Sequence, residues 1–263
     1  MKISICTDML FAGIPTPEAM RLVKAVGADA VEFWGTNGKD LAAIAAVSRE
    51  IELPVATFCA PGTPSLISPE GPTGFAAALR ESVGYCDTLG CRQLIVTSGS
   101  PQGGWTPAQM HARLVESVLN AVPVLEEYDL VLTLEPLNAS EQSYLCNSRE
   151  AFDICRMANN PHLRVLYDAY HMQYMEGNLL NTLLGNLAAV GHIHAANLPG
   201  RTSPAVGEIN YPYLIKKMDE AGYTGYMGLE YKPLVREEHA IVAELITTIN
   251  HMRSKRERHH ATV

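Results

Sequence analysis

Short apolar runs alternate with longer segments in which apolar residues recur at helical spacing. The short runs are rich in Val, Ile and Leu and are bounded by Gly, Pro or Asn, which is typical of buried strands. They predict eight strands, over residues 2–7, 30–34, 54–58, 93–97, 130–135, 163–168, 191–195 and 225–230. The longer segments predict eight helices, over residues 16–26, 39–51, 75–89, 107–128, 148–159, 178–187, 211–221 and 237–252.

Turn and capping residues support several helix boundaries. Thr16-Pro17-Glu18 places a proline in the first turn of a helix, and Gly27 follows the end of the same helix. Asn147 and Asn210 precede two other helices as N-cap residues. The helical assignments therefore rest on local chemistry as well as on periodicity.

The strand–helix alternation repeats about every 30 residues, which is typical of βα units. Eight units in 263 residues fit a closed (β/α)8 TIM barrel, an α/β fold that takes roughly 250 residues. An open doubly wound sheet is the alternative, but the turn over residues 8–13 lacks its Gly-rich pattern. We expect a single barrel domain over residues 1–263, with a polar C-terminal tail over about residues 253–263.

Composition excludes several classes of protein. With 47% hydrophobic residues the chain has enough apolar material for a core, and its net charge of −8 disfavours nucleic acid as a partner. We find no apolar run near the roughly 20 residues that span a bilayer, and no signal-peptide pattern at the amino terminus. The six cysteines form no C-x-x-C pair and are expected to be reduced and buried. We therefore expect a cytoplasmic protein that does not bind membranes.

The last four predicted strands each end in a residue that can bind a metal ion. These residues are Glu135, Asp168, His194 and Glu230. Catalytic groups of a barrel lie at the C-terminal ends of its strands, so the four side chains converge on one rim. A single Glu at a strand end is more often a solvated loop residue, but four such residues in succession are harder to explain in that way. Clustered carboxylates repel one another, and a divalent cation resolves that conflict.

The donor set narrows the choice of ion. Three carboxylates and one imidazole suit Mn²⁺, Mg²⁺ or Co²⁺, whereas Zn²⁺ is less favoured with one nitrogen and no thiolate. His192 and His194 lie two residues apart on one strand and so face the same side at different depths. We take His194, nearer the C-terminal end, as the ligand, and His192 as a deeper supporting or core residue.

Three further residues lie near this rim. His171, in a predicted loop after Asp168, either donates to a substrate oxygen or caps a turn. Arg201 lies in a long connection that can fold over the site, where it could pair with a substrate carboxylate. Lys232 is a second cation, although an exposed lysine there needs no functional explanation. Two cations beside a carboxylate cluster favour an anionic small-molecule substrate.

Several motifs resemble one superfamily along essentially the whole chain. They are DAVEF at 29–33, FCAPG at 58–62, LEPLN at 134–138, DAYHMQ at 168–173, GEINYP at 207–212 and GLEYKP at 228–233. On these motifs the chain resembles the xylose-isomerase-like TIM barrels, which include sugar isomerases, sugar 3-epimerases and endonuclease IV. Within them it is most similar to the hydroxypyruvate isomerase and 2-oxo-tetronate isomerase family.

The resemblance implies a site, an activity and a mechanism. The metal ligands of the family map onto the four residues already selected by position. The implied reaction is the isomerisation of hydroxypyruvate to tartronate semialdehyde, or of a 2-oxo-tetronate analogue, by proton transfer through an enediolate. Glu135 and Glu230 would be the facing catalytic carboxylates, and His171, Arg201 and Lys232 would contact the substrate. A direct hydride shift is the alternative mechanism. Sugar isomerases of this type are often dimers or tetramers, so a homo-oligomer is an open expectation.

Three other functions are weighed against this one. A ketose 3-epimerase acting on free sugars would use the same metal and carboxylate pair. The seventh-strand ligand can be Gln in hydroxypyruvate isomerases and is usually His in the epimerases, so His194 leaves the substrate open. An endonuclease-IV-like phosphodiesterase would need more histidines and a basic groove. A non-catalytic sugar-acid binding protein would not need two carboxylates that face each other across a metal.

Overall fold

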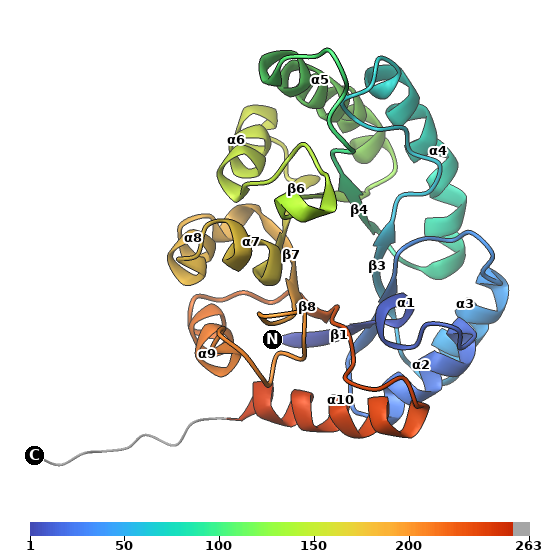
Figure 1. The fold of residues 1–263 in the computed structure, drawn as a ribbon. Helices are drawn as coiled ribbons and strands as arrows, with labels where there is room; N and C mark the ends of the chain where they lie inside the picture. Colours follow the sequence, from blue (N-terminus) through green and yellow to red (C-terminus); the bar gives the residue numbers. More distant parts are fainter. Residues whose placement is uncertain (255–263) are drawn as a thin grey trace, which may run out of the picture.

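A computed structural model describes residues 1–254 as a closed barrel of eight parallel strands (Figure 1). The strands are β1 (Lys2–Cys6), β2 (Ala30–Phe33), β3 (Val55–Cys59), β4 (Gln93–Thr97), β5 (Val131–Glu135), β6 (Leu163–Asp168), β7 (Val190–Ala195) and β8 (Tyr226–Leu229). Each strand pairs with the next in the chain, and β1 pairs with β8, where Ile5 lies opposite Leu229. The predicted TIM barrel is therefore confirmed.

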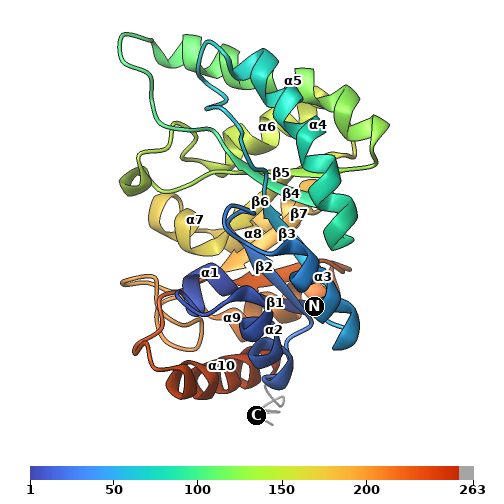
Figure 2. The same cartoon turned by 90° about the vertical axis from the view of Figure 1, so that its right-hand side faces the viewer.

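A ring of helices surrounds the strands, as Figure 1 shows in one view and Figure 2 in the view turned by 90°. The α-helices are α1 (Thr7–Leu10), α2 (Thr16–Ala25), α3 (Leu41–Glu50), α4 (Gly71–Leu89), α5 (Pro107–Glu127), α6 (Ser148–Ala158), α7 (Ala169–Met175), α8 (Leu179–Gly185), α9 (Tyr211–Glu220) and α10 (Glu238–Arg253). Two short 3-10 helices are η1 (Ala139–Glu141) and η2 (Leu187–Ala189). Helix α10 lies between α9 and α2 in Figure 1 and completes the ring.

The predicted N-caps of two helices are confirmed. The Asn147 side chain accepts a hydrogen bond from Glu150 N (2.8 Å), and that of Asn210 accepts one from Tyr213 N (3.2 Å). Each bond satisfies a backbone N–H that has no partner within its own helix. Helix α9 therefore begins at a fixed point immediately after the long connection from β7.

Two short helices were not predicted. Helix α1 follows β1 directly, and α7 follows β6, where the sequence had indicated a loop. The cause at α7 is Asp168, whose side chain caps the helix by accepting from Tyr170 N (2.7 Å) and His171 N (3.2 Å). Because α7 begins at the strand end, His171 lies on a helix.

The last helix ends at about the residue where the polar C-terminal tail was predicted to begin. Arg253 is the last residue of α10, and its guanidinium bonds to Asp29 Oδ2 (2.8 Å) and to the Gly27 carbonyl (2.9 Å). These contacts hold the end of α10 against the connection between α2 and β2. Residues 255–263 of the predicted tail lie outside the described residues.

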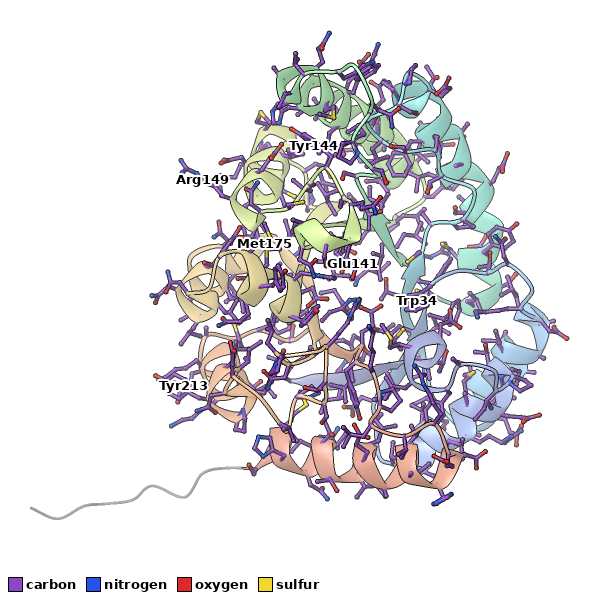
Figure 3. All side chains as sticks on the ribbon, in the orientation of Figure 1. Trp34, Glu141, Tyr144, Arg149, Met175 and Tyr213 are labelled. Carbon is purple, nitrogen blue, oxygen red and sulfur yellow. The ribbon has the colours of Figure 1, made fainter. Side chains whose placement is uncertain are left out.

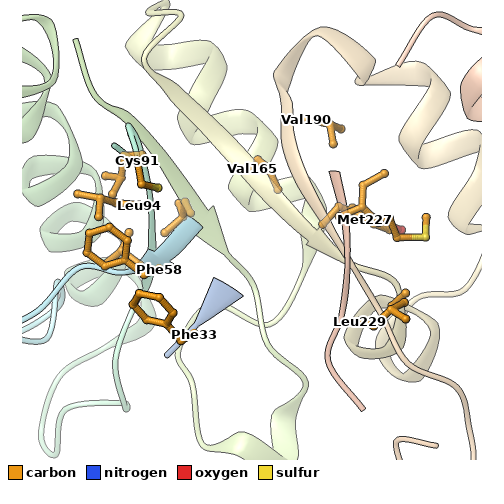
Figure 4. Packing of buried hydrophobic residues seen from close by; sticks show 14 of the residues in the cluster. Phe33, Phe58, Cys91, Leu94, Val165, Val190, Met227 and Leu229 are labelled. Carbon is orange, nitrogen blue, oxygen red and sulfur yellow. The ribbon is translucent and has the colours of Figure 1, made fainter. Parts of the chain in front are cut away.

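Side chains alternate between the barrel interior and the layer beneath the helices. The layer beneath the helices is apolar, and Figure 4 shows Phe33 of β2 beside Phe58 of β3, with ring centroids 5.7 Å apart. The preceding residue of β2, Glu32, points the other way into the interior, where it contacts His192 and Ser4. One strand therefore supplies both the apolar core and the polar interior.

All six cysteines are free thiols, and four of them are buried, as the sequence led us to expect. Among the helices of residues 1–254, none is long and apolar enough to cross a membrane.

Candidate metal and active site

Four side chains gather at the C-terminal end of the barrel and are called the rim cluster below. They are Glu135 at the end of β5, Asp168 at the end of β6, His194 on β7 and Glu230 directly after β8. One ligand atom from each lies within 4.8 Å of the others, and all four residues are buried. The structure thus brings together the four residues selected at the strand ends.

His194 lies at the centre of the rim cluster. Its Nδ1 is 3.3 Å from Glu230 Oε2 and 3.5 Å from Glu135 Oε1. Both ring nitrogens of His194 are buried and make no hydrogen bond among the described residues. Burial disfavours a charged imidazole, but the negative charges of Glu32 and Glu230 raise the pKa of His194 well above its usual value.

Glu230 accepts hydrogen bonds from two nitrogen donors. The Arg201 guanidinium and the Trp34 indole N–H both bond to its carboxylate. Burial alone would raise the pKa of Glu230, but the positive charges of His194 and Arg201 and the Trp34 hydrogen bond lower it to about 2. Glu230 is therefore fixed as a carboxylate.

Trp34 was not among the predicted site residues. It follows β2, and in Figure 3 it lies near the centre of the ring of helices, as does Glu141, whereas Arg149 and Tyr213 lie at its outer edge. Asp8 holds the segment in place by accepting from Trp34 N (2.8 Å) and from Lys39 Nζ (2.6 Å). The sequence contains no local signal that would connect an indole on the second strand with a carboxylate on the eighth.

His171 is buried behind Asp168, and its placement in a loop was wrong. Its Nε2 lies 3.4 Å from Asp168 Oδ2. Its Nδ1 accepts a hydrogen bond from the backbone N–H of Asn138 (3.2 Å) and lies 2.8 Å from Nδ2 of the Asn138 side chain. Because the backbone N–H of Asn138 occupies Nδ1, the neutral ring carries its proton on Nε2, toward Asp168. Asn138 is a residue that sequence reasoning missed, although it lies in the LEPLN motif.

The connection between β7 and α9 brings Arg201 to the rim, as the sequence predicted. Asn197 shapes this connection, because its side-chain oxygen accepts from Leu198 N (3.0 Å) and Ile209 N (2.9 Å). The Arg201 guanidinium is only 12% exposed and lies 3.8 Å from Asp168 Oδ2 and 3.7 Å from Glu141 Oε1. In this structure it contacts protein carboxylates, and its contact with a substrate carboxylate stays a prediction.

Lys232 is not brought into the rim cluster. Its backbone N–H donates to the Arg201 carbonyl (2.7 Å), but its side chain is exposed and forms no ion pair within residues 1–254. At the rim, Lys232 therefore acts only through this backbone hydrogen bond, which holds the segment that carries Arg201.

A second set of polar side chains lies deeper in the barrel and is called the interior cluster below. It consists of Ser4, Glu32 and His192, and its carboxylate also contacts His194. His192 is fully buried, in agreement with its predicted place beneath the ligand histidine. Glu32 was not predicted, although a carboxylate in the apolar strand Ala30–Phe33 is an unusual feature that could have indicated it.

The fold and the rim cluster together define a class of protein. The family described as xylose isomerase-like TIM barrel matches residues 20–251, and the chain belongs to this family.

Within that class the chain is similar to proteins that are named as isomerases of sugar acids. It is 36% identical to hydroxypyruvate isomerase of Escherichia coli K12 over 167 residues, which span 63% of each chain. It is 32% identical to the human putative hydroxypyruvate isomerase over 235 residues, covering 82% of this chain and 84% of the human protein. It is 31% identical to 2-oxo-tetronate isomerase of Cupriavidus necator over 161 residues, covering 60% of this chain and 62% of that protein. The matches to the two bacterial enzymes thus span less than two thirds of their length.

Solved structures share the fold. A Brucella melitensis protein described as AP endonuclease, family 2 superposes with a TM-score of 0.84 at 27% identity, covering 91% of this chain and 96% of that one. D-psicose 3-epimerase of Clostridium cellulolyticum H10, solved with D-tagatose, gives a TM-score of 0.82 at 16% identity, covering 96% and 98%. The second likeness is one of fold alone.

Proposed function

We propose that the protein is a metal-dependent isomerase of a short sugar acid. The reaction would interconvert the 2-keto and 2-hydroxy-aldehyde forms, such as hydroxypyruvate and tartronate semialdehyde or a 2-oxo-tetronate pair. The observation that carries this proposal is the rim cluster, in which three buried carboxylates surround an imidazole nitrogen that has no hydrogen bond. The names of the relatives support the same reaction class.

The rim cluster fits a divalent cation. Glu135, Asp168 and Glu230 would supply oxygen atoms and His194 would supply Nδ1. Oxygen-rich sites of this kind suit Mn²⁺, Mg²⁺ or Co²⁺ better than Zn²⁺. When bound, the cation would act as a Lewis acid that polarises the carbonyl and hydroxyl oxygens of the substrate.

The proton transfer would be performed by the carboxylates. For hydroxypyruvate, a base removes a proton from the hydroxymethyl carbon, the electron pair forms an enediolate, and the proton is returned to the neighbouring carbon. The hydroxyl proton passes from the terminal oxygen, which becomes the aldehyde oxygen, to the former keto oxygen, which becomes the hydroxyl. Glu135 and Glu230 are the candidates for these steps. Glu135 is the better acceptor, because Glu230 is already bonded to both Arg201 and Trp34. A positioned base of this kind contributes about 10²–10⁴-fold to the rate.

Arg201 would hold the acid group of the substrate. Its Nη2 is bonded to Glu230, while its Nη1 makes a looser contact of 3.7 Å with the half-exposed Glu141. A guanidinium has five N–H donors, so one edge can bind a substrate carboxylate while the other stays on Glu230. His171 would stabilise negative charge at the rim through its contact with Asp168. Lys232 stays a candidate second cation, although its ammonium is exposed.

A ketose 3-epimerase is the second candidate function. His194, rather than Gln, at the seventh strand favours it, because His is the usual ligand of the epimerases. Arg201, buried among carboxylates at the rim, favours the acid substrate instead. The two functions therefore differ in whether the substrate must carry a negative charge.

The test joins metal content with a substrate panel. The purified protein is analysed for elements, stripped with a chelator, reloaded with Mn²⁺, Mg²⁺, Co²⁺ or Zn²⁺, and assayed by NMR on hydroxypyruvate, 2-oxo-tetronates and free ketoses. We expect turnover of the acids only after reloading. Turnover of free ketoses alone would establish the epimerase, and metal binding without any turnover would indicate a binding protein.

The same assay in D₂O separates the two mechanisms. Proton transfer through an enediolate introduces deuterium at the product carbon in a single turnover. A hydride shift leaves that carbon unlabelled, and this result would overturn the carboxylate mechanism.

A further inference from the structure

The interior cluster is sealed inside the barrel, directly beneath the rim cluster. Ser4, Glu32 and His192 are at most 2% exposed. Ser4 Oγ donates to Glu32 Oε2 (2.6 Å), and His192 Nε2 lies 2.9 Å from the same oxygen. A buried carboxylate is costly unless it is bonded and paired, so this arrangement serves to hold Glu32 charged in one orientation.

The other oxygen of Glu32 faces the rim cluster. Glu32 Oε1 lies 3.0 Å from His194 Nε2, on the opposite edge of the imidazole from Glu135 and Glu230. His194 of the rim cluster therefore contacts the interior cluster directly. The positive charges of His192 and His194 outweigh the effect of burial and hold the pKa of Glu32 well below its usual value.

Gly228 of β8 makes the space for this carboxylate. A Cβ atom at residue 228 would lie 2.3 Å from Glu32 Oε1 and 2.6 Å from Glu32 Oε2. Any other residue at this place would displace Glu32 from beneath His194. Ser4 of β1, His192 of β7 and Gly228 of β8 thus each help to fix the one carboxylate that β2 carries.

We propose that Glu32 is a positioning residue for the metal site. A neutral imidazole carries a single proton, and a carboxylate 3.0 Å from Nε2 favours that proton on Nε2. The lone pair of Nδ1 then faces Glu135 and Glu230, where the cation would lie. Carboxylates that bond to the far nitrogen of a metal-binding histidine generally fix its tautomer and orientation in this way. This proposal rests on the metal site of the proposed function.

A second cation held by Glu32, His192 and His194 is the competing reading of the same residues. It is less favoured, because Glu32 Oε2 and His192 Nε2 already bond to each other, so that only Glu32 Oε1 and His194 Nε2 face each other without a hydrogen bond. The two readings differ in stoichiometry: positioning requires one ion per chain, whereas a second site requires two.

The main measurement is the metal affinity of the whole chain after its metal has been removed with a chelator. This readout does not depend on turnover. Mn²⁺ is titrated by calorimetry into the wild type and into Glu32→Gln, which keeps the volume of the side chain but removes its charge. We expect one Mn²⁺ per chain in the wild type and about 10- to 100-fold weaker binding in the variant. At saturating Mn²⁺ the variant should recover most of its kcat, since Glu32 does not touch the substrate.

Two further variants keep the result interpretable. Thr133→Val removes another buried polar group of the barrel, one that bonds only to the Leu94 carbonyl (3.0 Å), and should leave the Mn²⁺ affinity unchanged. If Glu32→Gln does not fold, Ser4→Ala removes a single donor to Glu32 and should weaken Mn²⁺ binding by a few-fold.

Each outcome decides a different claim. If Glu32→Gln lowers the unfolding temperature but binds Mn²⁺ as tightly as the wild type, Glu32 is only structural and the inference is wrong. Two Mn²⁺ per chain in the wild type, with one lost in the variant, would make Glu32 a ligand. A wild type that binds no metal would overturn the proposed function itself.

Discussion

The rim cluster and the interior cluster contain the same kinds of side chain but differ in how their charges are neutralised. In the interior cluster, Ser4, His192 and His194 surround the single carboxylate of Glu32. In the rim cluster, three carboxylates surround the imidazole of His194. Among the described residues, Arg201 is the one further cation that contacts these carboxylates. The charge of Glu32 is therefore balanced by neighbouring imidazoles, although its Oε1 forms no hydrogen bond among the described residues, whereas the rim cluster has an excess of negative charge.

This difference separates a structural use of buried charge from a functional one. A charged group buried without a partner costs several kcal/mol, so a fold keeps such a group only where another cation can offset it. Nδ1 of His194 has the same meaning, because it faces Glu135 and Glu230 without a hydrogen bond among the described residues and can bind a cation there. We therefore expect substitutions in the rim cluster to act mainly on activity, and those in the interior cluster on metal affinity and stability.

The largest effect is expected for Glu135→Gln. The change removes the proposed base and a proposed metal ligand while keeping the shape of the side chain, so kcat should fall by about 10²–10⁴-fold or more. Turnover is measured by NMR at saturating Mn²⁺, and circular dichroism checks that the barrel is folded. Glu50→Gln, which alters only an exposed ion pair with Arg21, is the matched control. Activity that survived in Glu135→Gln would remove Glu135 from the mechanism.

The rim cluster was predictable from sequence for a simple geometric reason. In a parallel barrel every strand ends on the same side, so the residues that close strands five to eight must converge even though their distances are unknown. Glu135, Asp168 and Glu230 could be found in this way, and the spacing of His192 and His194 fixed their relative depth.

The interior cluster could not be predicted in the same way. Glu32 and His192 are 160 residues apart, and their contact depends on the register of strands around the closed barrel. The sequence pattern shows which residues of each strand point into the barrel. It does not give the register between strands, so it does not show which inward residues meet. His171 shows the same limit on a local scale, because the cap at Asp168 turned an expected loop into a helix.

Arg201→Lys should separate binding of the substrate from the chemical step. The change keeps the charge beside Glu230 but removes the planar pair of donors that a carboxylate prefers. Loss of one charge-assisted hydrogen bond costs about 1.5–3 kcal/mol, or roughly a 10- to 100-fold rise in KM for the acid substrate. The measurement is a full kinetic series on hydroxypyruvate and on a free ketose. An equal loss on both substrates would show that Arg201 does not recognise the acid group.

Gly228→Ala tests the interior cluster through its packing. The added methyl group would lie within 2.3 Å of Glu32 Oε1, so the carboxylate must move. Overpacking of this kind costs about 1–3 kcal/mol of stability, and in a chain of this size each kcal/mol lowers Tm by roughly 2–4 °C. Calorimetric unfolding of the metal-free protein measures the loss. Gly84→Ala, on a helix where a Cβ meets no atom within 4 Å, is the control and should not lower Tm. An unchanged Tm in Gly228→Ala would mean that Glu32 is less tightly confined than the structure indicates.

The smallest effect is expected for Trp34→Phe at the edge of the rim cluster. The change removes the indole donor to Glu230 but keeps an aromatic ring, and Arg201 continues to neutralise the same carboxylate. Loss of one hydrogen bond from a partly exposed donor costs about 1 kcal/mol, which corresponds to roughly a fivefold fall in kcat/KM. Tyr144→Phe removes a comparable aromatic donor from Glu150, outside both clusters, and should leave kcat/KM unchanged. If Trp34→Phe lowered kcat/KM as much as Glu135→Gln, the indole rather than Arg201 would be the main support of Glu230. The charge balance drawn between the two clusters would then have to be revised.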